Sequence, residues 1–376
     1  MQSFLQLVAH DLYTKIGNDL SRTALIFPNK RANLFFNEYL AGESDQPIWS
    51  PAAMSISDLF QKLSVQKSGD PIRLVCELYK VFKEETQSQE TLDDFYFWGE
   101  LLISDFDDVD KNMVDADKLF SNLQDLKNLM DDYEFLDKEQ EEAIQQFFQN
   151  FSIEKRTELK EKFISLWDKL GTIYHRYRAN LTELGIAYEG MLYRNVIEQL
   201  DTDQLKYDKY IFVGFNVLNK VENDFFRKLK DAGKALFYWD YDIFYTQQIK
   251  KHEAGEFLKR NLEEFPNELP ESFFNTFKEP KKIRYISAST ENAQARFLPG
   301  WIKAITNDHS QIAIEKEKEN AVVLCNEALL LPVLHSIPQE VKNVNITMGF
   351  PLAQTPVYSF INAVMELQTN GYRSDT

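Results

Sequence analysis

The sequence predicts an α/β protein whose mostly parallel sheet is interrupted by a large helical insertion. Short apolar runs of strand length occur near the beginning of the chain and again after residue 205, and helix-length stretches separate them. Between about residues 70 and 205 the apolar residues recur instead at spacings of three and four. Alternating strands and helices favour parallel pairing through right-handed crossovers.

The first strand is predicted at residues 23–27 (TALIF), and Pro28 and Asn29 end it. Residues 30–40 then have the apolar spacing of a helix. Its predicted buried side carries Phe35, Phe36, Tyr39 and Leu40. Further strands are predicted at residues 210–213, 235–239, 283–286 and 321–324, with a helix at residues 221–232 between the first two.

The middle of the chain is predicted to be a helical insertion. One long helix in it ends before Gly185, which stands where a helix-terminating glycine is expected. Its periodic apolar residues are Leu159, Phe163, Leu166, Leu170, Ile173, Tyr177, Leu181 and Leu184. A stretch rich in Pro and Asn, residues 265–280, marks the predicted boundary between two sheet-containing units. The predicted domains are residues 1–70 with 205–280, the insertion 71–204, and residues 281–376.

The net charge of −17 is concentrated in one segment. Residues 91–150 contain 17 Asp or Glu against 4 Lys and no Arg, a balance of −13, so the rest of the chain carries only −4. Nucleic-acid affinity depends largely on Lys and Arg near phosphates. A DNA-binding surface is therefore compatible with the chain outside this acidic segment.

The chain is expected to be cytoplasmic and to have no membrane partner. Its two cysteines, Cys76 and Cys325, lie far apart and have no Cys or His at metal-ligand spacing. The amino-terminal segment lacks the basic region and the cleavage site of a signal peptide, and no apolar run approaches the ~20 residues of a membrane span. The five histidines show neither metal nor triad spacing.

A phosphate-binding loop is missing from the sequence. Such a loop needs glycines that let backbone N–H groups surround the phosphates, and a Lys followed by Ser or Thr. The segment from Gly17 to Thr23 lacks the second Gly and the Lys, and Gly233-Lys234 lacks the upstream Gly and the hydroxyl residue. No nucleotide cofactor is therefore expected in this segment.

The turn Asn29-Lys30-Arg31 is the candidate DNA-binding site. A strand feeds a helix here, so the turn offers backbone donors, a helix N-terminus and two cations to a phosphate. The alternative is an ordinary solvated helix start, because Lys and Arg are common on surfaces.

Two further segments resemble catalytic sites but lack the required residues. The acidic run from Asp105 to Asp110 fails the calcium-loop template, so we expect no metal and a carboxylate-rich helical face instead. The strand at 210–213 ends in Gly214, Phe215 and Asn216, where nucleotide hydrolases carry acidic residues. The second segment is interpreted as a degenerate hydrolase edge with no catalytic residue.

Five segments, taken in order, resemble the AddB-type subunit of bacterial helicase–nuclease complexes, in particular the Bacteroidetes PD-(D/E)XK nuclease family proteins. They are residues 23–40 (TALIFPNKRANLFFNEYL), 50–59 (SPAAMSISDL), 98–110 (WGELLISDFDDVD), 212–222 (FVGFNVLNKVE) and 345–356 (NITMGFPLAQTP). The resemblance implies RecA-like domains of the superfamily-1 helicase type, with the insertion interrupting the first and residues 281–376 beginning the second. It also places Asn29, Lys30 and Arg31 where motor helicases contact single-strand backbone.

The resemblance implies a non-motor DNA-binding scaffold in double-strand-break repair and recombination. The implied partners are single-stranded or forked DNA and an AddA-like helicase subunit. The family's nuclease domain, with its PD-(D/E)XK site and expected Mg²⁺, would lie beyond Thr376, so we expect a fragment of an exodeoxyribonuclease and no catalysis in these residues. The alternative is a protein-interaction module whose acidic insertion docks a basic partner without DNA contact.

Overall fold

The computed structural model describes residues 2–120, 156–248, 252–306 and 320–371, which form two compact units, Met1–Glu279 and Pro280–Thr376. The first unit contains a four-stranded parallel sheet of order β2-β1-β5-β6. Its strands are β1 (Thr23–Phe27), β2 (Ala52–Ser55), β5 (Lys209–Val213) and β6 (Ala235–Tyr238). The predicted α/β class and parallel sheet are therefore confirmed. Strand β2, with the sequence Ala-Ala-Met-Ser, was not predicted.

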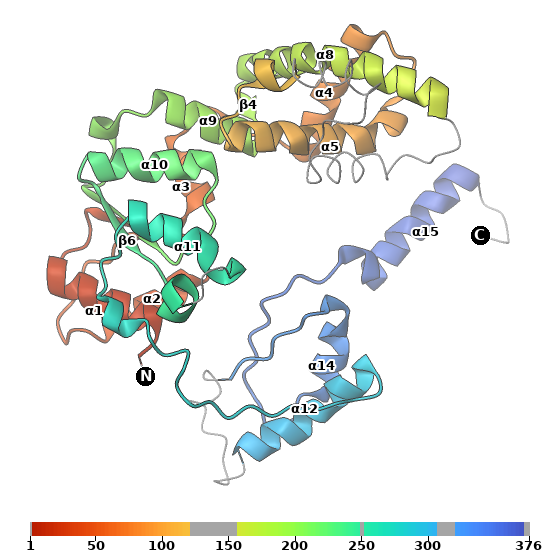
Figure 1. Ribbon diagram of the computed structural model, residues 1–376. Helices are drawn as coiled ribbons and strands as arrows, with labels where there is room; N and C mark the ends of the chain where they lie inside the picture. The colour runs from red at the N-terminus through yellow and green to blue at the C-terminus, as the bar shows by residue number, and fades with distance from the viewer. Residues whose placement is uncertain (1, 121–155, 249–251, 307–319, 372–376) are drawn as a thin grey trace. The chain divides into compact units, whose positions relative to one another are not determined.

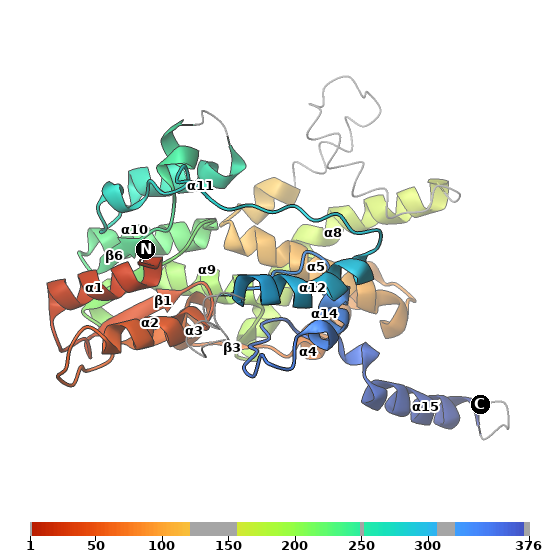
Figure 2. The same ribbon diagram turned by 90° about the horizontal axis from the view of Figure 1, so that it is seen from below.

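The sheet is covered by helices on both faces. Helices α1 (Phe4–Ile16) and α2 (Ala32–Ala41) lie side by side in both views (Figure 1, Figure 2) and share a buried cluster with Leu25, Ile211 and Tyr238. The alternate residues Ile26 and Phe212 belong to the opposite cluster, with α3 (Ile56–Leu63) and α10 (Lys220–Asp231). Successive strand residues point to opposite faces, so continuous apolar strands suit a sheet that is buried on both sides.

Local sequence explains where the helices next to the sheet begin. Helix α3 starts at a capping box of Ser55 and Asp58, and α10 starts at one of Asn219 and Glu222. In α2 the packing differs from the prediction. Phe36 and Leu40 are buried, but Phe35 is 40% exposed because it lies on the outer side of the helix.

The helical insertion leaves and rejoins the sheet unit through two short parallel strands, β3 (Lys67–Ser68) and β4 (Ile186–Ala187). It contains α4 (Pro71–Thr86), α5 (Leu92–Lys111) and α8 (Arg156–Glu183), and α4 packs against both of the others (Figure 1). The predicted long helix corresponds to α8, and Gly185 follows it with φ +68°. The prediction missed β4, whose two residues are too few for a recognisable pattern. Helix α9 (Glu189–Gln199) then packs against α5.

The first unit is completed by short elements around the sheet. After α9 comes the 3₁₀ turn η3 (Thr202–Gln204), and after β6 come the π-helical turn η4 (Phe244–Gln248), α11 (Glu253–Glu264) and the 3₁₀ turn η5 (Glu271–Phe273). Trp239, buried just past β6, donates a 2.8 Å hydrogen bond from Nε1 to the Phe265 carbonyl. None of the described helices combines the length and hydrophobicity required to cross a bilayer.

In its described residues, the second unit contains helices and no strand. They are α12 (Glu291–Thr306), η6 (Glu327–Leu329), α14 (Leu330–Ser336), η7 (Leu352–Gln354) and α15 (Pro356–Asn370). The strands predicted at residues 283–286 and 321–324 are therefore wrong for the described structure. Tyr285 is 90% and Val323 83% exposed. An apolar run of strand composition becomes a strand only where a neighbouring strand supplies hydrogen-bond partners.

Candidate functional site

The sheet order places two turns that the sequence singled out, residues 29–31 and residues 214–216, next to each other. From β1 the chain moves to β2 on one side, and β5 pairs with the opposite side of β1. The register pairs Ile26 with Phe212, so the turns that follow β1 and β5 leave from adjacent strand ends. Parallel α/β sheets bind ligands at such a topological switch point, outside the carboxyl ends of the strands.

The turn after β1 is exposed from Pro28 to Arg31. Asn29 Oδ1 accepts hydrogen bonds from the backbone N–H of Arg31 at 3.1 Å and of Ala32 at 3.4 Å. The expectation that these donors are available to a phosphate is therefore wrong for two of them, because the Asn29 side chain fills the place of an anion at the start of α2. The cationic side chains remain as the groups that can attract a phosphate.

Lys30 forms an ion pair with the first turn of α3. Its Nζ lies 3.0 Å from Asp58 Oδ1, and the two side chains are 75% and 28% exposed, respectively. Asp58 also accepts hydrogen bonds from the Ser55 hydroxyl at 2.8 Å and the Ser55 N–H at 3.3 Å. The hydrogen bond from Lys30, followed by that from Ser55, holds the pKa of Asp58 below its usual value.

The turn after β5 is occupied by internal contacts. Gly214 has φ +73° and donates its N–H to the Tyr238 carbonyl at 2.9 Å. Phe215 is buried, and the Asn216 carbonyl accepts a 2.6 Å hydrogen bond from Asn261. The structure therefore places no carboxylate at Gly214, Phe215 or Asn216. The turn lies at the carboxyl edge of the parallel sheet, and residues 214–216 carry no acidic side chain.

Helix α10 is also capped by its own residues. Asn219 accepts the Glu222 N–H at 2.8 Å, and Glu222 accepts the Asn219 N–H at 3.1 Å. Burial raises the pKa of Glu222. The starts of α2, α3 and α10 all lie at the carboxyl edge, where helix dipoles favour an anion. Each of them already binds an internal oxygen, so an external phosphate must be held mainly by side chains.

A polar chain runs from this edge into the insertion. The Ser57 hydroxyl donates to Glu189 Oε1 at 3.2 Å, and Lys111 Nζ lies 2.6 Å from Glu189 Oε2 and 2.7 Å from Asp107 Oδ2. Burial opposes the charge of Lys111, but the hydrogen bonds to Asp107 and Glu189 outweigh it and raise the pKa. The residue after Ser57 is Asp58, the partner of Lys30. The sheet edge and the insertion are thus joined by adjacent polar side chains.

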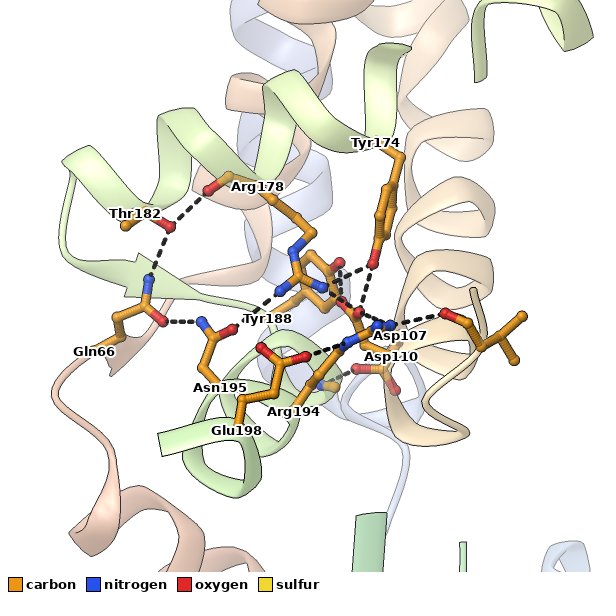
Figure 3. Close-up of polar contacts among 12 residues, drawn as sticks. Gln66, Asp107, Asp110, Tyr174, Arg178, Thr182, Tyr188, Arg194, Asn195 and Glu198 are labelled. Atoms are coloured by element: carbon orange, nitrogen blue, oxygen red, sulfur yellow. Dashed lines mark hydrogen bonds and ion pairs between the residues drawn. The ribbon is translucent and has the colours of Figure 1, made fainter. Parts of the chain in front are cut away.

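The sequence did not predict the buried charge cluster around Asp110. Figure 3 shows Tyr174, Tyr188 and two arginines converging on this fully buried carboxylate. The tyrosine hydroxyls donate hydrogen bonds of 2.5 Å each, and Arg178 and Arg194 form ion pairs with it. The predicted carboxylate-rich helical face does not include Asp110, because Asp110 shares the buried side of α5 with Phe106 and Val109. The helical spacing of Phe106 and Val109 next to Asp110 was the signal in the sequence that could have predicted this burial.

A cleft of about 340 Å³ opens beside the polar chain, between the start of α4, helix α5 and the start of α9. Its lining includes the carboxylates of Glu100, Asp107 and Glu189, which disfavour a phosphate ligand. In the ranges that the structure describes, no three or more His, Cys, Asp or Glu side chains are grouped to hold a metal ion. The cationic turn at Lys30 and Arg31 is therefore the better candidate for binding DNA.

No protein-family profile and no curated protein sequence matches this chain.

Proposed function

We propose that this chain is a non-motor, helicase-like DNA-binding scaffold of the AddB type, acting in double-strand-break repair and recombination. The observation that carries the proposal is the exposed turn at Asn29, Lys30 and Arg31, located at the switch point of a parallel sheet. Single-stranded or forked DNA is the proposed ligand, held by its phosphates.

The same edge supports a role without nucleotide hydrolysis. No phosphate loop exists in the sequence, the helix starts are capped internally, and Gly214 to Asn216 provide no carboxylate for magnesium or water. In the RecA-like arrangement proposed here, ATP hydrolysis belongs to an AddA-like partner. Strand cleavage belongs to a PD-(D/E)XK nuclease domain that uses Mg²⁺.

The test measures binding of the whole chain to a fluorescent single-stranded 20-mer at several salt concentrations. Changing Lys30→Glu and Arg31→Glu together is expected to weaken binding at least ten-fold and to reduce the salt slope by about 1.4, or ~0.7 per lost phosphate contact. The control Lys80→Glu with Lys118→Glu changes the net charge equally, at exposed lysines of the insertion unit. Salt-insensitive binding, or equal affinity of both double variants, would exclude the turn as the DNA site.

A second candidate function is partner docking by the insertion. On the outer side of α5, Phe97 is 63% and Leu101 40% exposed, and they lie four residues apart. The exposed carboxylates of Asp94, Asp105 and Asp108 follow the same side of the helix. Apolar side chains flanked by acids suit a basic amphipathic segment.

Replacing Phe97 and Leu101 by Asp separates the two functions. If the insertion docks an AddA-like subunit, this variant loses co-purification with that subunit while DNA affinity is unchanged. If DNA binding is the function and docking is not, co-purification survives. DNA-stimulated phosphate release above background by the wild-type chain would contradict the non-motor assignment.

A further inference from the structure

The ion pair between Lys30 and Asp58 joins a carboxylate that accepts further hydrogen bonds to a lysine that is largely exposed. Asp58 is fixed in the capping box of α3 by two hydrogen bonds from Ser55. Lys30 projects from an exposed turn with three-quarters of its side chain accessible, and among the described residues its ammonium forms an ion pair with Asp58. A change at this pair would therefore move the lysine and leave the carboxylate in place.

Resting on the proposed DNA contact, we infer that Asp58 competes with DNA phosphate for Lys30 and thereby sets the affinity of the site. A phosphate that binds Lys30 must displace Asp58 or share the ammonium with it. In both arrangements the phosphate gains less from the Lys30 ammonium than it would from an ammonium without a carboxylate partner. Ser55 continues to donate both hydrogen bonds to Asp58 when Lys30 leaves. The exchange therefore requires no unfolding of α3.

The expected size of the effect follows from the exposure of the pair. Exposed ion pairs are weak, and their removal changes equilibria by about two- to five-fold. Neutralising Asp58 is therefore expected to tighten DNA binding two- to five-fold at low salt. The gain should shrink as salt rises, because exposed charges are screened.

The experiment is a double-mutant cycle on the full chain, with a fluorescent single-stranded DNA 20-mer as the probe. The four proteins are the wild type, Asp58→Asn, Lys30→Gln and the double variant. Asparagine keeps an oxygen acceptor for Ser55, so the α3 cap is retained while the charge is removed. The expected result is tighter binding for Asp58→Asn in the wild-type background and no gain in the Lys30→Gln background.

Two controls separate competition from other effects. Asp115→Asn makes the same change in net charge at the exposed partner of Lys118 and should leave DNA affinity unchanged. Ser55→Ala weakens the α3 cap but keeps the Asp58 charge, so it should not tighten binding. Thermal midpoints of all variants show whether the substitutions have destabilised the folded chain.

The outcomes distinguish the inference from the proposed function. Equal affinity of the wild type and Asp58→Asn, while Lys30→Gln binds more weakly, overturns the competition but keeps the DNA site. The same gain from Asp58→Asn with and without Lys30 also overturns it, because the effect is then general electrostatics. Failure of the wild type to bind DNA at low salt refutes the proposed function and the inference together.

Discussion

The backbone N–H of Gly190 donates a 2.5 Å hydrogen bond to Oδ1 of Asp107, and this contact brings the start of α9 against α5. A Cβ atom on Gly190 would lie 2.3 Å from the Asp107 carbonyl oxygen, closer than real Cβ atoms approach non-bonded heavy atoms. Only glycine therefore permits this approach. This close approach positions α5 against α9, the helix that precedes β5 in the chain.

Changing Gly190→Ala is expected to lower the free energy of unfolding by about 1–3 kcal/mol, because backbone must move to admit the methyl group. The control is Gly171→Ala in α8, whose Cβ would meet Phe120 Cβ at an ordinary 3.6 Å. That change should be neutral or stabilise by up to about 1 kcal/mol through helix propensity. Urea unfolding of both variants measures the difference, and equal midpoints would show that α9 can shift away from α5.

Removing the buried carboxylate of Asp110 is expected to destabilise the chain strongly. Arg178 and Arg194 would keep their charges with no carboxylate between them, so Asp110→Ala should lower the unfolding free energy by about 3–5 kcal/mol. Asp108→Ala, on the exposed side of the same helix, should change it by no more than about 0.5 kcal/mol. Chemical denaturation compares the two, and similar small losses would contradict a structural role for the cluster.

Alkaline pH is expected to weaken the fold through the tyrosines of this cluster. Burial, and then the neighbouring Asp110 carboxylate, raises the pKa of Tyr174 to about 12 from its ordinary value of 10. A raised folded pKa means that the stabilisation is fully present below pH 10 and is lost as the pH rises from 10 to 12. At pH 11 the loss from Tyr174 should be about 1.4 kcal/mol.

Unfolding free energies at pH 9 and pH 11 test this expectation. Tyr174→Phe removes the titrating hydroxyl, so the variant should lose less stability than the wild type between these two pH values. It will be less stable at pH 9, because the hydrogen bond to Asp110 is gone. An identical pH slope in both proteins would show that Tyr174 does not titrate in this range.

The turn after β5 is expected to require a residue that adopts positive φ. Gly214 has φ +73°, where a β-branched side chain is strained. Gly214→Val should lower stability by about 1–2 kcal/mol or more, whereas Gly214→Asn should lower it less, because asparagine tolerates the left-handed region. Thermal unfolding of the two variants provides the comparison. A valine variant as stable as the asparagine variant would contradict the strain argument.

Local patterns in the sequence were sufficient for three of the four strands of the parallel sheet and for the helices next to them. The apolar runs at β1, β5 and β6 have strand length and end in turn residues, and the periodic residues of α8 are followed by Gly185. Buried parallel strands carry this signal because both of their faces are covered. Strand β2 was missed because Ala-Ala-Met-Ser has no β-branched or aromatic residue. Strands β3 and β4 were missed because two residues are too few to form a pattern.

Only the tertiary structure decided which of these elements meet. The sequence by itself identified the turn at Lys30 and the turn at Gly214 as separate segments, about 180 residues apart, and the order β2-β1-β5-β6 made them neighbours. The pairs Lys30–Asp58 and Asp110–Arg178 likewise join residues from different helices and turns. Pairing in a parallel sheet and charge burial between helices depend on distant partners, so no local pattern encodes them. The same reason explains why residues 283–286 and 321–324, with strand composition but no paired neighbour, are not strands in the described structure.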